Sequence, residues 1–538
     1  MNVSYLIIKN LLKSRIENEA DLASFKRKVA KKYKISCPSN IELLKAYHKL
    51  LKERRVKKSE NIEKILKTRP IRSLSGIVNI SVLTKPYSCP GKCVFCPLEK
   101  GIPKSYLSGE PAVERAKGLK YDPYLQIEKR IEMLELEGHP TDKIELRIVG
   151  GTWSFYPRNY QNWFIKRCFE ACNKKTTTHP PLSHRRRAPG KSLKDAQILN
   201  EKAKNRIVGL SIETRPDFIN KKEIFRLRNL GVTMVEIGVQ TVFDDVLKIN
   251  KTNLNQNKII QATKLLKDAG FKVLYHLMLN LPGSDFKKDL ECFQVVFEDK
   301  RFKPDWIKIY PVVVTKGSEL YEIWKKGKYK PYSEKKLIEL LVQIKKILPY
   351  WVRVARILRD IPVPKIEAGC KISNLREVVK REIEKRDLLC KCIRCREIKG
   401  KYDQREKVYL FREDYDASNG REIFLSFENK KRNKLYSLLR LRIPSQVFKK
   451  ERYFIPVLKI SAIIREIQTY GELVPIAEKK LAPQHRGLGK KLIKEAEKIA
   501  KKELKLKKIS IIAGIGTREY FRKFGYKLKK TYMIKFLK

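Results

Sequence analysis

Three cysteines near residue 90 have the type and spacing that an iron–sulfur centre requires. Cys89, Cys93 and Cys96 follow the pattern C-x3-C-x2-C, so each thiolate can bind one iron of a [4Fe–4S] cube and leave the fourth iron open to another ligand. The same thiols would also suit a zinc knuckle that lacks one ligand, and three cysteines can lie near one another by chance. Other features of the chain favour the cluster.

A second cysteine group, near residue 390, has the spacing of a zinc half-site. Cys390, Cys392 and Cys395 follow the pattern C-x-C-x2-C, and Cys370 is the expected fourth ligand of a tetrahedral zinc site. A remote histidine or a water could complete the tetrahedron instead. Such clustering among 11 cysteines, in a chain without a signal-peptide pattern, favours metal binding over disulfides. A closed site would brace the joint between two domains.

A glycine-containing loop near residue 487 could bind a pyrophosphate. Its bare amides and the positive end of the following helix suit such a group. A strand at 509–513 and an aromatic segment with Tyr520, Phe521 and Tyr526 come next. This order resembles the acyl-CoA site of the GNAT acetyltransferases, so acetyl-CoA is the expected ligand. The loop consists of Gln484, His485, Arg486, Gly487, Leu488 and Gly489.

Strands and helices alternate between about residues 76 and 365, and they must position the first cysteine group. Strands are expected at 76–83, 144–149, 207–212, 234–239, 272–279 and 306–314, with amphipathic helices between them, for example at 125–136, 255–269 and 285–298. Such alternation builds a parallel sheet, closed or partly closed into a barrel, with its active site at the carboxyl ends of the strands. The cysteines follow the first strand. With this spacing the sequence resembles the radical S-adenosylmethionine (SAM) enzymes.

Polar residues follow the second and third strands, where SAM would lie. Gly150 and Gly151, which precede Thr152, let the backbone approach the amino group of SAM, although a glycine pair is also a plain turn. Glu213 suits ribose hydroxyls and Arg215 suits a carboxylate, although the two could also form a structural ion pair.

Later strands add further candidates for the same site. Gln240 ends the fourth strand and is expected to contact the cofactor. Lys308 and Tyr310 lie two positions apart on one face of the sixth strand, so both could act in catalysis at the barrel mouth. His276 is equally well explained as a core residue. A long polar insert at 174–204 is too long for a simple connection, so it is a functional loop or a flexible one.

The charge of the sequence is strongly unbalanced. The chain has 120 Lys plus Arg against 59 Asp plus Glu, a formal net charge of +61. Such an excess is stabilised beside a polyanion, so we expect nucleic acid first, a membrane surface second and a lysine-rich thermophilic surface third. No apolar run approaches the roughly 18 to 20 residues of a membrane span. The N-terminus lacks a cleavage pattern, and we expect a cytoplasmic protein with no membrane contact.

Changes in sequence pattern divide the 538 residues into four parts. Residues 1–75 form a basic helical region with an apolar stripe at Leu22, Phe25, Val29 and Tyr33. Residues 76–365 form the barrel, 366–400 the cysteine linker, and 401–538 an α+β domain with antiparallel strands at 408–413, 422–428, 436–442 and 462–470. The N-terminal region also carries a positive cluster, here called the basic arm, which could contact phosphates or be an ordinary solvated helix face. The basic arm consists of Lys49, Lys52, Arg54, Arg55, Lys57 and Lys58.

Taken together, these parts resemble the catalytic subunit of Elongator, in its archaeal single-chain form. The expected fold is therefore a multidomain α/β protein, with a radical SAM (β/α) partial barrel, a GNAT domain and a helical basic N-terminal region. The stretches that carry the resemblance, besides the cysteine loop after Lys85, are 106–111, 121–126, 212–217, 236–240, 309–311, 373–376, 484–489 and 514–518.

The resemblance implies carboxymethylation of carbon 5 of the wobble uridine (position 34) in tRNA. In this reaction a 5′-deoxyadenosyl radical made from SAM takes hydrogen from the methyl group of acetyl-CoA. The acetyl radical then adds to uracil, and oxidation and thioester hydrolysis leave the carboxymethyl group. Relatives often have two tyrosines where this chain has Tyr520 and Phe521, so Tyr520 is the expected hydroxyl near the thioester. The insert at 174–204 would cover the acetyl-CoA site until tRNA binds.

Two other functions remain open at this point. One is a protein lysine acetyltransferase whose iron–sulfur cluster is structural, and the other is a tRNA-binding scaffold with degenerate sites. The expected cofactors and co-substrates are a [4Fe–4S] cluster, SAM, acetyl-CoA and zinc, and the expected partner is tRNA. The sequence is compatible with a homodimer and says nothing of accessory subunits.

Overall fold

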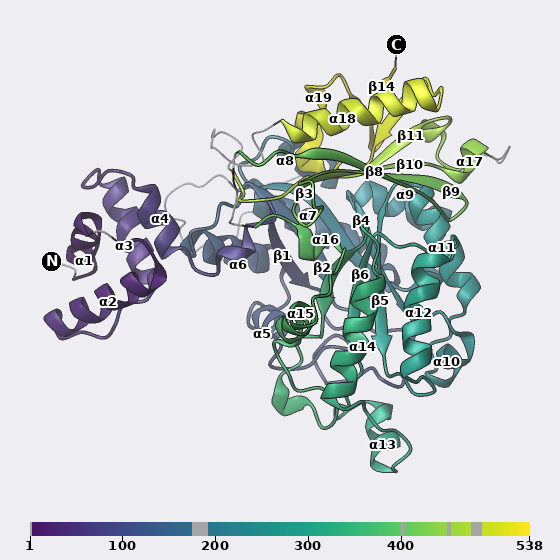
Figure 1. Ribbon diagram of the computed structural model, residues 1–538, viewed down its shortest axis with the longest axis horizontal. Coiled ribbons are helices and arrows are strands. Elements are labelled where there is room, and N and C mark those ends of the chain that lie inside the picture. Colours follow the sequence, from purple (N-terminus) through teal and green to yellow (C-terminus); the bar gives the residue numbers. More distant parts are fainter. Residues whose placement is uncertain are drawn as a thin grey trace.

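The computed structural model describes residues 3–14, 16–174, 192–399, 403, 405–448, 453–474 and 487–537. Three packed units follow one another along the chain: a helical N-terminal lobe, a half-barrel of parallel strands and a second, mostly antiparallel sheet (Figure 1). This architecture confirms the predicted multidomain α/β fold. Within the described residues, no helix has the length and apolarity that crossing a membrane requires.

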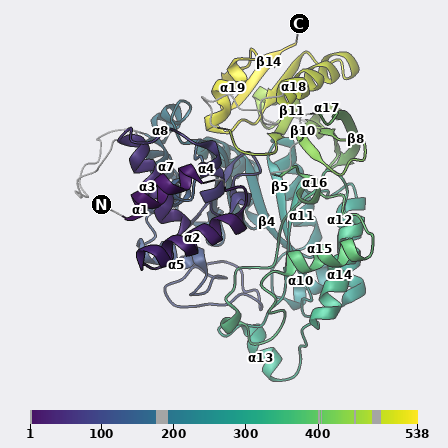
Figure 2. The same ribbon diagram turned by 60° about the vertical axis from the view of Figure 1, so that its left-hand side comes forward.

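The N-terminal lobe has four helices around a core of its own. They are α1 (Val3–Lys13), α2 (Glu19–Tyr33), α3 (Asn40–Lys52) and α4 (Glu60–Leu66). The predicted stripe on α2 packs into this core, and Ser39 starts α3 with a capping box. The lobe projects from the half-barrel in Figure 1 and lies in front in the turned view of Figure 2. All six side chains of the basic arm are exposed.

Seven parallel strands form the half-barrel in the order of the sequence. They are β1 (Val78–Leu83), β2 (Lys143–Val149), β3 (Arg206–Thr214), β4 (Met234–Gln240), β5 (Lys272–Leu279), β6 (Trp306–Pro311) and β7 (Arg353–Ile357). The first six match the predicted strands, but β3 continues through Glu213 and β6 ends before residue 314. The sequence did not predict β7, because two arginines among five residues hide its apolar pattern. With β1 and β7 at the two edges, the barrel closes only in part.

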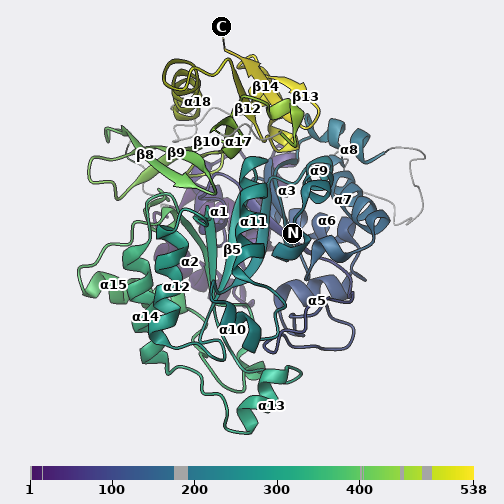
Figure 3. The same ribbon diagram turned by 90° about the vertical axis from the view of Figure 1, so that its right-hand side faces the viewer.

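Helices between the strands cover the convex face of the sheet. Apolar residues on that face of the strands, such as Ile80, Ile144 and Val235, pack against them in the largest core. Figure 3 shows α11, α12 and α14 along the outer side of β5. The helices of this unit are α5 (Pro111–Gly118), α6 (Pro123–Leu136), α7 (Arg158–Asn173), α8 (Leu193–Asn200), α9 (Lys221–Leu230), α10 (Asp244–Ile249), α11 (Gln256–Asp268), α12 (Phe286–Glu298), α13 (Glu319–Lys325) and α14 (Glu334–Ile347), and, after β7, α15 (Leu375–Lys385) and α16 (Ile393–Arg396).

The second sheet has the order β13-β14-β12-β11-β10-β9-β8, and only β11 and β12 pair in parallel. Its strands are β8 (Tyr409–Ala417), β9 (Gly420–Glu428), β10 (Leu435–Ile443), β11 (Ala462–Thr469), β12 (Lys508–Ile511), β13 (Lys527–Lys529) and β14 (Tyr532–Phe536). Five of them match predicted strands, and the terminal hairpin of β13 and β14 was not predicted. The helices of this unit are α17 (Ser445–Phe448), α18 (Leu488–Lys498), the π-helix η7 (Ile499–Glu503) and α19 (Arg518–Arg522).

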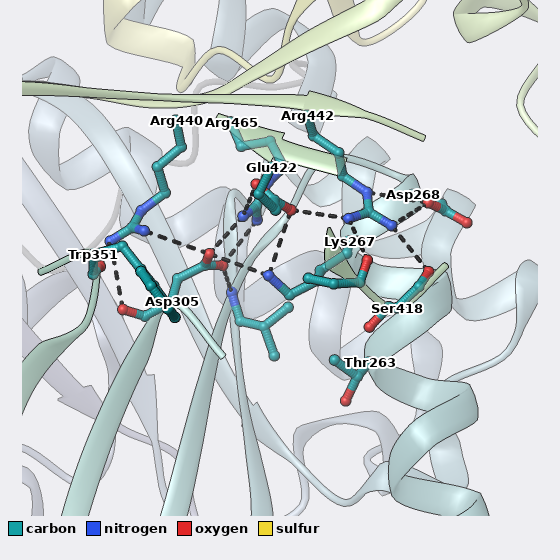
Figure 4. Close-up of polar contacts among 12 residues, drawn as sticks. Thr263, Lys267, Asp268, Asp305, Trp351, Ser418, Glu422, Arg440, Arg442 and Arg465 are labelled. Carbon is teal, nitrogen blue, oxygen red and sulfur yellow. Dashed lines mark hydrogen bonds and ion pairs between the residues drawn. The ribbon is translucent and has the colours of Figure 1, made fainter. Parts of the chain in front are cut away.

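A buried network of ion pairs joins the second sheet to the amino-terminal ends of the barrel strands (Figure 4). Arg465 of β11 donates to Asp305, just before β6, at 2.8 Å, and to Glu422 of β9 at 3.1 Å. Lys267 of α11 lies 3.4 Å from Asp305 and 3.5 Å from Glu422. Arg442 of β10 pairs with Glu422 and, at 2.6 Å, with Asp268 of α11. All these side chains are at most 1% exposed, so they fix one docking geometry of the two units.

Removal of Asp305 is expected to destabilise the protein by about 3–5 kcal/mol, because Asp305→Ala leaves Arg465 and Lys267 buried with one carboxylate fewer. Chemical or thermal unfolding measures this change. The matched control is Asp414→Ala, which removes an exposed carboxylate from Arg412 and Arg421 and should change stability by less than about 1 kcal/mol.

The stabilisation by Asp305 should also depend on pH. Burial alone would raise the pKa of Asp305, but Arg465, Lys267 and Arg440 hold it well below its usual value. A carboxyl group with a depressed folded-state pKa stabilises fully above its unfolded pKa of about 4, and this contribution disappears as the pH falls further. Equal stability of wild type and Asp305→Ala at neutral pH would contradict the role assigned to the network.

Candidate active site

A cavity of about 430 Å³ opens at the carboxyl ends of the barrel strands, and the first cysteine group lies in it. Cys89, Cys93 and Cys96 all line this cavity on the loop that follows β1. The loop is tight at Gly91, where an added Cβ would lie 2.7 Å from Arg215 Nη1 and 3.6 Å from Cys93 Sγ. The absence of a side chain there lets Arg215 approach the cysteines.

The electrostatics of the loop suit thiolate ligands. A hydrogen bond with Cys96 raises the pKa of Cys93, and the same bond lowers the pKa of Cys96 to about 7. Arg359 and Lys104 also lower the pKa of Cys96, against the effect of burial. Three cysteines that face one cavity beside cationic groups fit a [4Fe–4S] cluster, whose ligands are thiolates.

The glycine pair after β2 brings backbone to the edge of the same cavity. Gly150 has φ +128°, and an added Cβ would lie only 2.1 Å from Thr84 Oγ1, so no other residue fits there without a shift. Gly151 and Thr152 line the cavity. Thr152 Oγ1 lies 3.6 Å from Cys89 Sγ. The glycine pair and the cysteine loop therefore meet.

Charged side chains from β3 to β6 form the floor of the cavity. Lys308 lies 3.2 Å from Glu213 and forms a closer ion pair with Glu236, and His276 Nε2 lies 3.0 Å from Glu236. Burial alone would raise the pKa of Glu236, but Lys308, His276 and Arg147 lower it far below its usual value. The oxygens of Glu213 and Glu236 and a nitrogen of His276 lie within 4.8 Å of one another. Lys308 already supplies the cation between these carboxylates.

The remaining predicted residues of this site also line the cavity. Tyr310 does so with its ring edge-on to His276, at 5.5 Å between centroids. Gln240 does so at the end of β4, with φ +69°. The Arg215 guanidinium hydrogen-bonds Asp217 at 2.9 and 3.0 Å and the Thr252 carbonyl at 2.9 Å, so its ion-pair partner is Asp217 and not Glu213.

Tyr106, Arg359, Glu236 and Arg147 are among the residues of the cavity wall that sequence reasoning missed. Tyr106 donates to Glu213 at 3.0 Å, and Arg359 donates to Ser105 Oγ at 2.9 Å beside it. Glu236 and Arg147 line the cavity from inside the barrel. Both strand residues point to the same face of the sheet as the predicted site residues, because every second side chain of a strand points to one face. This two-residue period was the signal in the sequence that could have revealed them.

A second cavity, of about 470 Å³, lies at the opposite, amino-terminal ends of the strands, against the second sheet. Gly489 of α18 and Tyr520 of α19 line it from one side, and Lys143 and Lys272 line it from the other. An added Cβ at Gly489 would lie 3.1 Å from the Tyr520 hydroxyl. Helix α18 therefore begins beside the tyrosine.

The other residues of the predicted pyrophosphate loop do not all lie beside this cavity. Gly487 precedes α18 with φ +69°, whereas Leu488 is buried in a neighbouring core. Gln484, His485 and Arg486 lie outside the described residues, as do positions 175–191 of the polar insert. Tyr526 is 1% exposed and donates to Glu497 at 2.9 Å, which makes it a core residue.

The later cysteines form a compact group without Cys370. The Sγ atoms of Cys390, Cys392 and Cys395 lie within 4.8 Å of one another, and Lys345 Nζ lies 3.2 Å from Cys395 Sγ. Hydrogen bonds from Cys390 and Cys392 lower the pKa of Cys395. The buried Cys370 is not part of this group. Spacing along the chain could not reveal this, because α15 lies between Cys370 and the other three cysteines in the sequence.

Comparison with known proteins gives consistent matches. Residues 84–292 match the model of the Radical SAM superfamily, and residues 304–385 match that of the Radical_SAM C-terminal domain. The chain is 44% identical over 517 residues to a tRNA uridine(34) acetyltransferase of Methanocaldococcus jannaschii, covering 94% of this chain and 91% of the relative. It is 36% identical over 558 residues to Elongator complex protein 3 of Homo sapiens, covering 99% and 96%.

A solved structure shares most of this fold. The structure of the archaeal Methanocaldococcus infernus Elp3 with an N-terminal deletion (1–46) matches with a TM-score of 0.73 and 43% identity. The match covers 86% of this chain and all of that one.

Replacement of Lys308 by methionine is expected to destabilise the protein by roughly 3 kcal/mol at pH 7, because Glu236 is completely buried and loses its closest cation. The loss also raises the pKa of Glu236, which then protonates at a higher pH in the folded state. The destabilisation should therefore be smaller at pH 5 than at pH 7, as measured by thermal unfolding.

The control is Lys326→Met, which removes a lysine that is exposed after α13. It should leave the unfolding temperature nearly unchanged at both pH values. If Lys308→Met lowered the unfolding temperature equally at pH 5 and pH 7, the charge balance described for Glu236 would be wrong.

Proposed function

Because the chain belongs to the radical SAM family that includes Elongator complex protein 3 and the tRNA uridine(34) acetyltransferases, we propose that it forms 5-carboxymethyluridine at the wobble uridine of tRNA. The co-substrates are SAM and acetyl-CoA. One observation carries the proposal: a cysteine-lined cavity and a second cavity with a helix N-terminus and a tyrosine occupy opposite ends of one half-barrel. A radical chemistry and a thioester substrate therefore have separate places in one enzyme.

Cys89, Cys93 and Cys96 would hold a [4Fe–4S] cluster, with Arg215 close to the loop at Gly91. When bound, the cluster supplies the electron and the open iron site that SAM cleavage requires. The backbone at Gly150 and Gly151 approaches the ligand where side chains are excluded. Glu213 accepts from Tyr106, at 3.0 Å, and faces Lys308, so its orientation is fixed before a ribose hydroxyl binds.

Lys308 and Tyr310 are the proposed catalytic residues of the cysteine-lined cavity. Burial alone would lower the pKa of Lys308, but Glu236, Tyr310 and Glu213 raise it, so its ammonium group stays protonated at neutral pH and donates hydrogen bonds. Tyr310 has a hydroxyl on the same strand face. Both groups suit a uracil base or a carboxylate product, since each can donate to an oxygen.

Acetyl-CoA would bind in the interdomain cavity, defined here as the one that Gly489 and Tyr520 line. The amides after Gly487 and the dipole of α18 would face the pyrophosphate. The Tyr520 hydroxyl would lie near the thioester, and Phe521, which is buried, can only pack. We assign residues 401–538 to this acetyl-CoA domain, of the GNAT type.

Zinc is the proposed ligand of Cys390, Cys392 and Cys395, in the linker at 366–400. Their Sγ atoms are close enough to share one ion. Since Cys370 lies outside the group, a fourth ligand must come from another residue or a water. Metal analysis of the purified protein tests this assignment.

Transfer RNA is the proposed substrate. The net charge of +61 and the exposed side chains of the basic arm support phosphate contacts by residues 1–75. The barrel at 76–365 would receive the wobble base at its carboxyl-terminal mouth. A lysine acetyltransferase with a structural cluster is the other candidate function, and its products differ.

The first prediction of this proposal concerns Cys96. Reduced, reconstituted wild-type protein with tRNA, SAM and acetyl-CoA should give 5′-deoxyadenosine and a modified uridine, detected by mass spectrometry. Cys96→Ser should lower both products at least 100-fold, because a cluster ligand is lost, while binding of a non-hydrolysable CoA analogue stays within about twofold.

The control is Cys292→Ser, a change in a buried cysteine to which Thr241 donates a hydrogen bond. This variant should keep both products. Acetylated protein without consumption of SAM would instead support the lysine acetyltransferase function.

The second prediction concerns the basic arm. Arg54→Glu combined with Lys57→Glu should weaken tRNA binding at least tenfold and flatten its salt dependence. Each phosphate contact that is lost lowers the slope of log K against log salt by about 0.7–0.9.

The control pair is Lys335→Glu with Lys346→Glu on α14, where both lysines are exposed. It changes the net charge by the same amount. Equal effects of the two pairs in a binding titration over several salt concentrations would remove the basic arm from the tRNA site.

A further inference from the structure

The two cavities approach each other inside the half-barrel. Glu145 lines the interdomain cavity, and Arg147 lines the cysteine-lined cavity. The two residues are two positions apart on β2, so their side chains share the inner face of the strand and lie about 7 Å apart along it. A partition that thin separates the proposed sites of the thioester and the radical.

The lumen at this level is polar on the side of β1 to β3, whereas Met234, Leu274 and Trp306 form a small apolar cluster on the side of β4 to β6. Barrels of this kind usually fill their interior with layers of branched aliphatic side chains. Here β1 and β3 place Asn79, Ser81, Gly209 and Ser211 on the inner face, beside Glu145 and Arg147 in the strand register, and Met234 of β4 follows beside Ser211. Asn79 is exposed although it belongs to β1. Small and polar side chains thus line the lumen on this side, where an aliphatic layer would otherwise close it.

The partition itself consists of charged groups around one indole ring. Arg147 Nη2 lies 3.1 Å from Glu145 Oε2, and Lys272 lies 3.7 Å from Glu145. Three cations, those of Arg147, Lys272 and Arg353, lie 5.0 to 5.7 Å from the ring of Trp306. Such a cluster can rearrange by side-chain rotation, whereas a packed aliphatic layer cannot.

Two buried donors in the partition, Arg147 Nε and Trp306 Nε1, lack a hydrogen-bond partner among the residues that the structure describes. An unsatisfied buried donor costs about 1–3 kcal/mol, and most buried polar groups do have a partner. Trp306 is 3% exposed. These donors would suit carbonyl oxygens that enter the lumen.

We propose that Glu145, Arg147 and Trp306 form a gate in the barrel lumen, through which the acyl arm of acetyl-CoA passes from the interdomain cavity to the cysteine-lined cavity. The proposal rests on the proposed function, because that function places acetyl-CoA in the first cavity and the radical in the second. The nucleotide end of the coenzyme stays at α18, and only the thin arm, with its amide and thioester carbonyls, crosses the partition.

Arg147 can pair with either of two carboxylates. Glu145 lies on the side of the interdomain cavity, and Glu236 lies on the side of the cysteine-lined cavity. Burial alone would lower the pKa of Arg147, but Glu145 and Glu236 raise it, so the guanidinium stays charged with either partner. Rotation of Arg147 from Glu145 toward Glu236 opens the space beside Glu145 without leaving an unpaired charge, since Lys272 remains with Glu145. Arg147 therefore keeps a carboxylate partner in both arrangements of the gate.

A labelling experiment tests the passage without relying on catalysis. Ser81 lines the cysteine-lined cavity and is the direct neighbour of Arg147 on β1. In the cluster-loaded Ser81→Cys variant, bromoacetyl-CoA should alkylate the introduced thiol with loss of bromide, as peptide mapping by mass spectrometry detects. Excess acetyl-CoA should suppress this labelling at least tenfold, because it occupies the interdomain cavity.

A matched pair of second changes distinguishes the lumen from other routes. Ser211 is buried in the partition between Arg147 and Met234. Added to Ser81→Cys, Ser211→Leu should lower the labelling at least tenfold by filling the lumen, whereas Ser211→Ala, which removes the same hydroxyl without adding volume, should keep it. Thermal unfolding and binding of a CoA analogue must be similar in the two variants.

The outcomes separate the gate from the proposed function. Labelling that acetyl-CoA does not suppress, or that Ser211→Leu leaves intact, overturns the gate even if the wild-type protein makes modified tRNA. In the same wild-type assay, acetyl-CoA deuterated at its methyl group should transfer deuterium to 5′-deoxyadenosine, and Ser211→Leu should abolish this transfer while 5′-deoxyadenosine still forms. If wild type makes no modified uridine although labelling follows the expected pattern, the proposed function fails and the passage stands.

Discussion

The buried ion pairs around Asp305 determine how this protein is assembled. Arg440, Arg442 and Arg465 reach from the second sheet to carboxylates at the amino-terminal ends of the barrel strands and at α11 (Figure 4). Each charge is out of contact with water, so a shifted docking would leave charges unpaired, at a cost of several kcal/mol. Apolar contacts alone would tolerate sliding much better. The network therefore specifies one orientation of the two units.

In that orientation the amino-terminal end of the barrel has a second structural role. In barrels of this kind the carboxyl ends of the strands carry the active site, while the opposite end contributes stability. Here the opposite end also forms one wall of a cavity, with Lys143 and Lys272 facing Gly489 and Tyr520. The same ion pairs that stabilise the interface hold this wall against α18 and α19. Stability and the second cavity thus depend on one set of contacts.

Inside the barrel, a column of paired charges lies beside the small apolar cluster of Met234, Leu274 and Trp306. Lys272, Glu145, Arg147, Glu236 and Lys308 alternate in sign from one cavity to the other. Such a column is tolerated in a buried lumen only because each charge has an opposite neighbour. The column places polar side chains on the side of the lumen where the two cavities approach each other.

The sequence by itself determined the parts of this protein that depend on local pattern. Apolar runs and helical periodicity predicted six of the seven barrel strands, and the positions of Cys89, Cys93 and Cys96 after β1 predicted that Gly150, Glu213 and Gln240 would lie near them. These inferences hold because parallel strands bring their carboxyl ends to one edge whatever their loops contain. The five-residue β7 and the terminal hairpin lacked such a pattern.

Only the tertiary structure decided which residues meet across the fold. It separated Cys370 from the later cysteines and joined Asp305 to Arg465, 160 residues away in the sequence. It also brought Glu145 and Arg147 between two cavities. Contacts of this kind depend on how whole sheets dock, and docking is set by the sum of many buried charges and apolar faces rather than by the spacing of any motif.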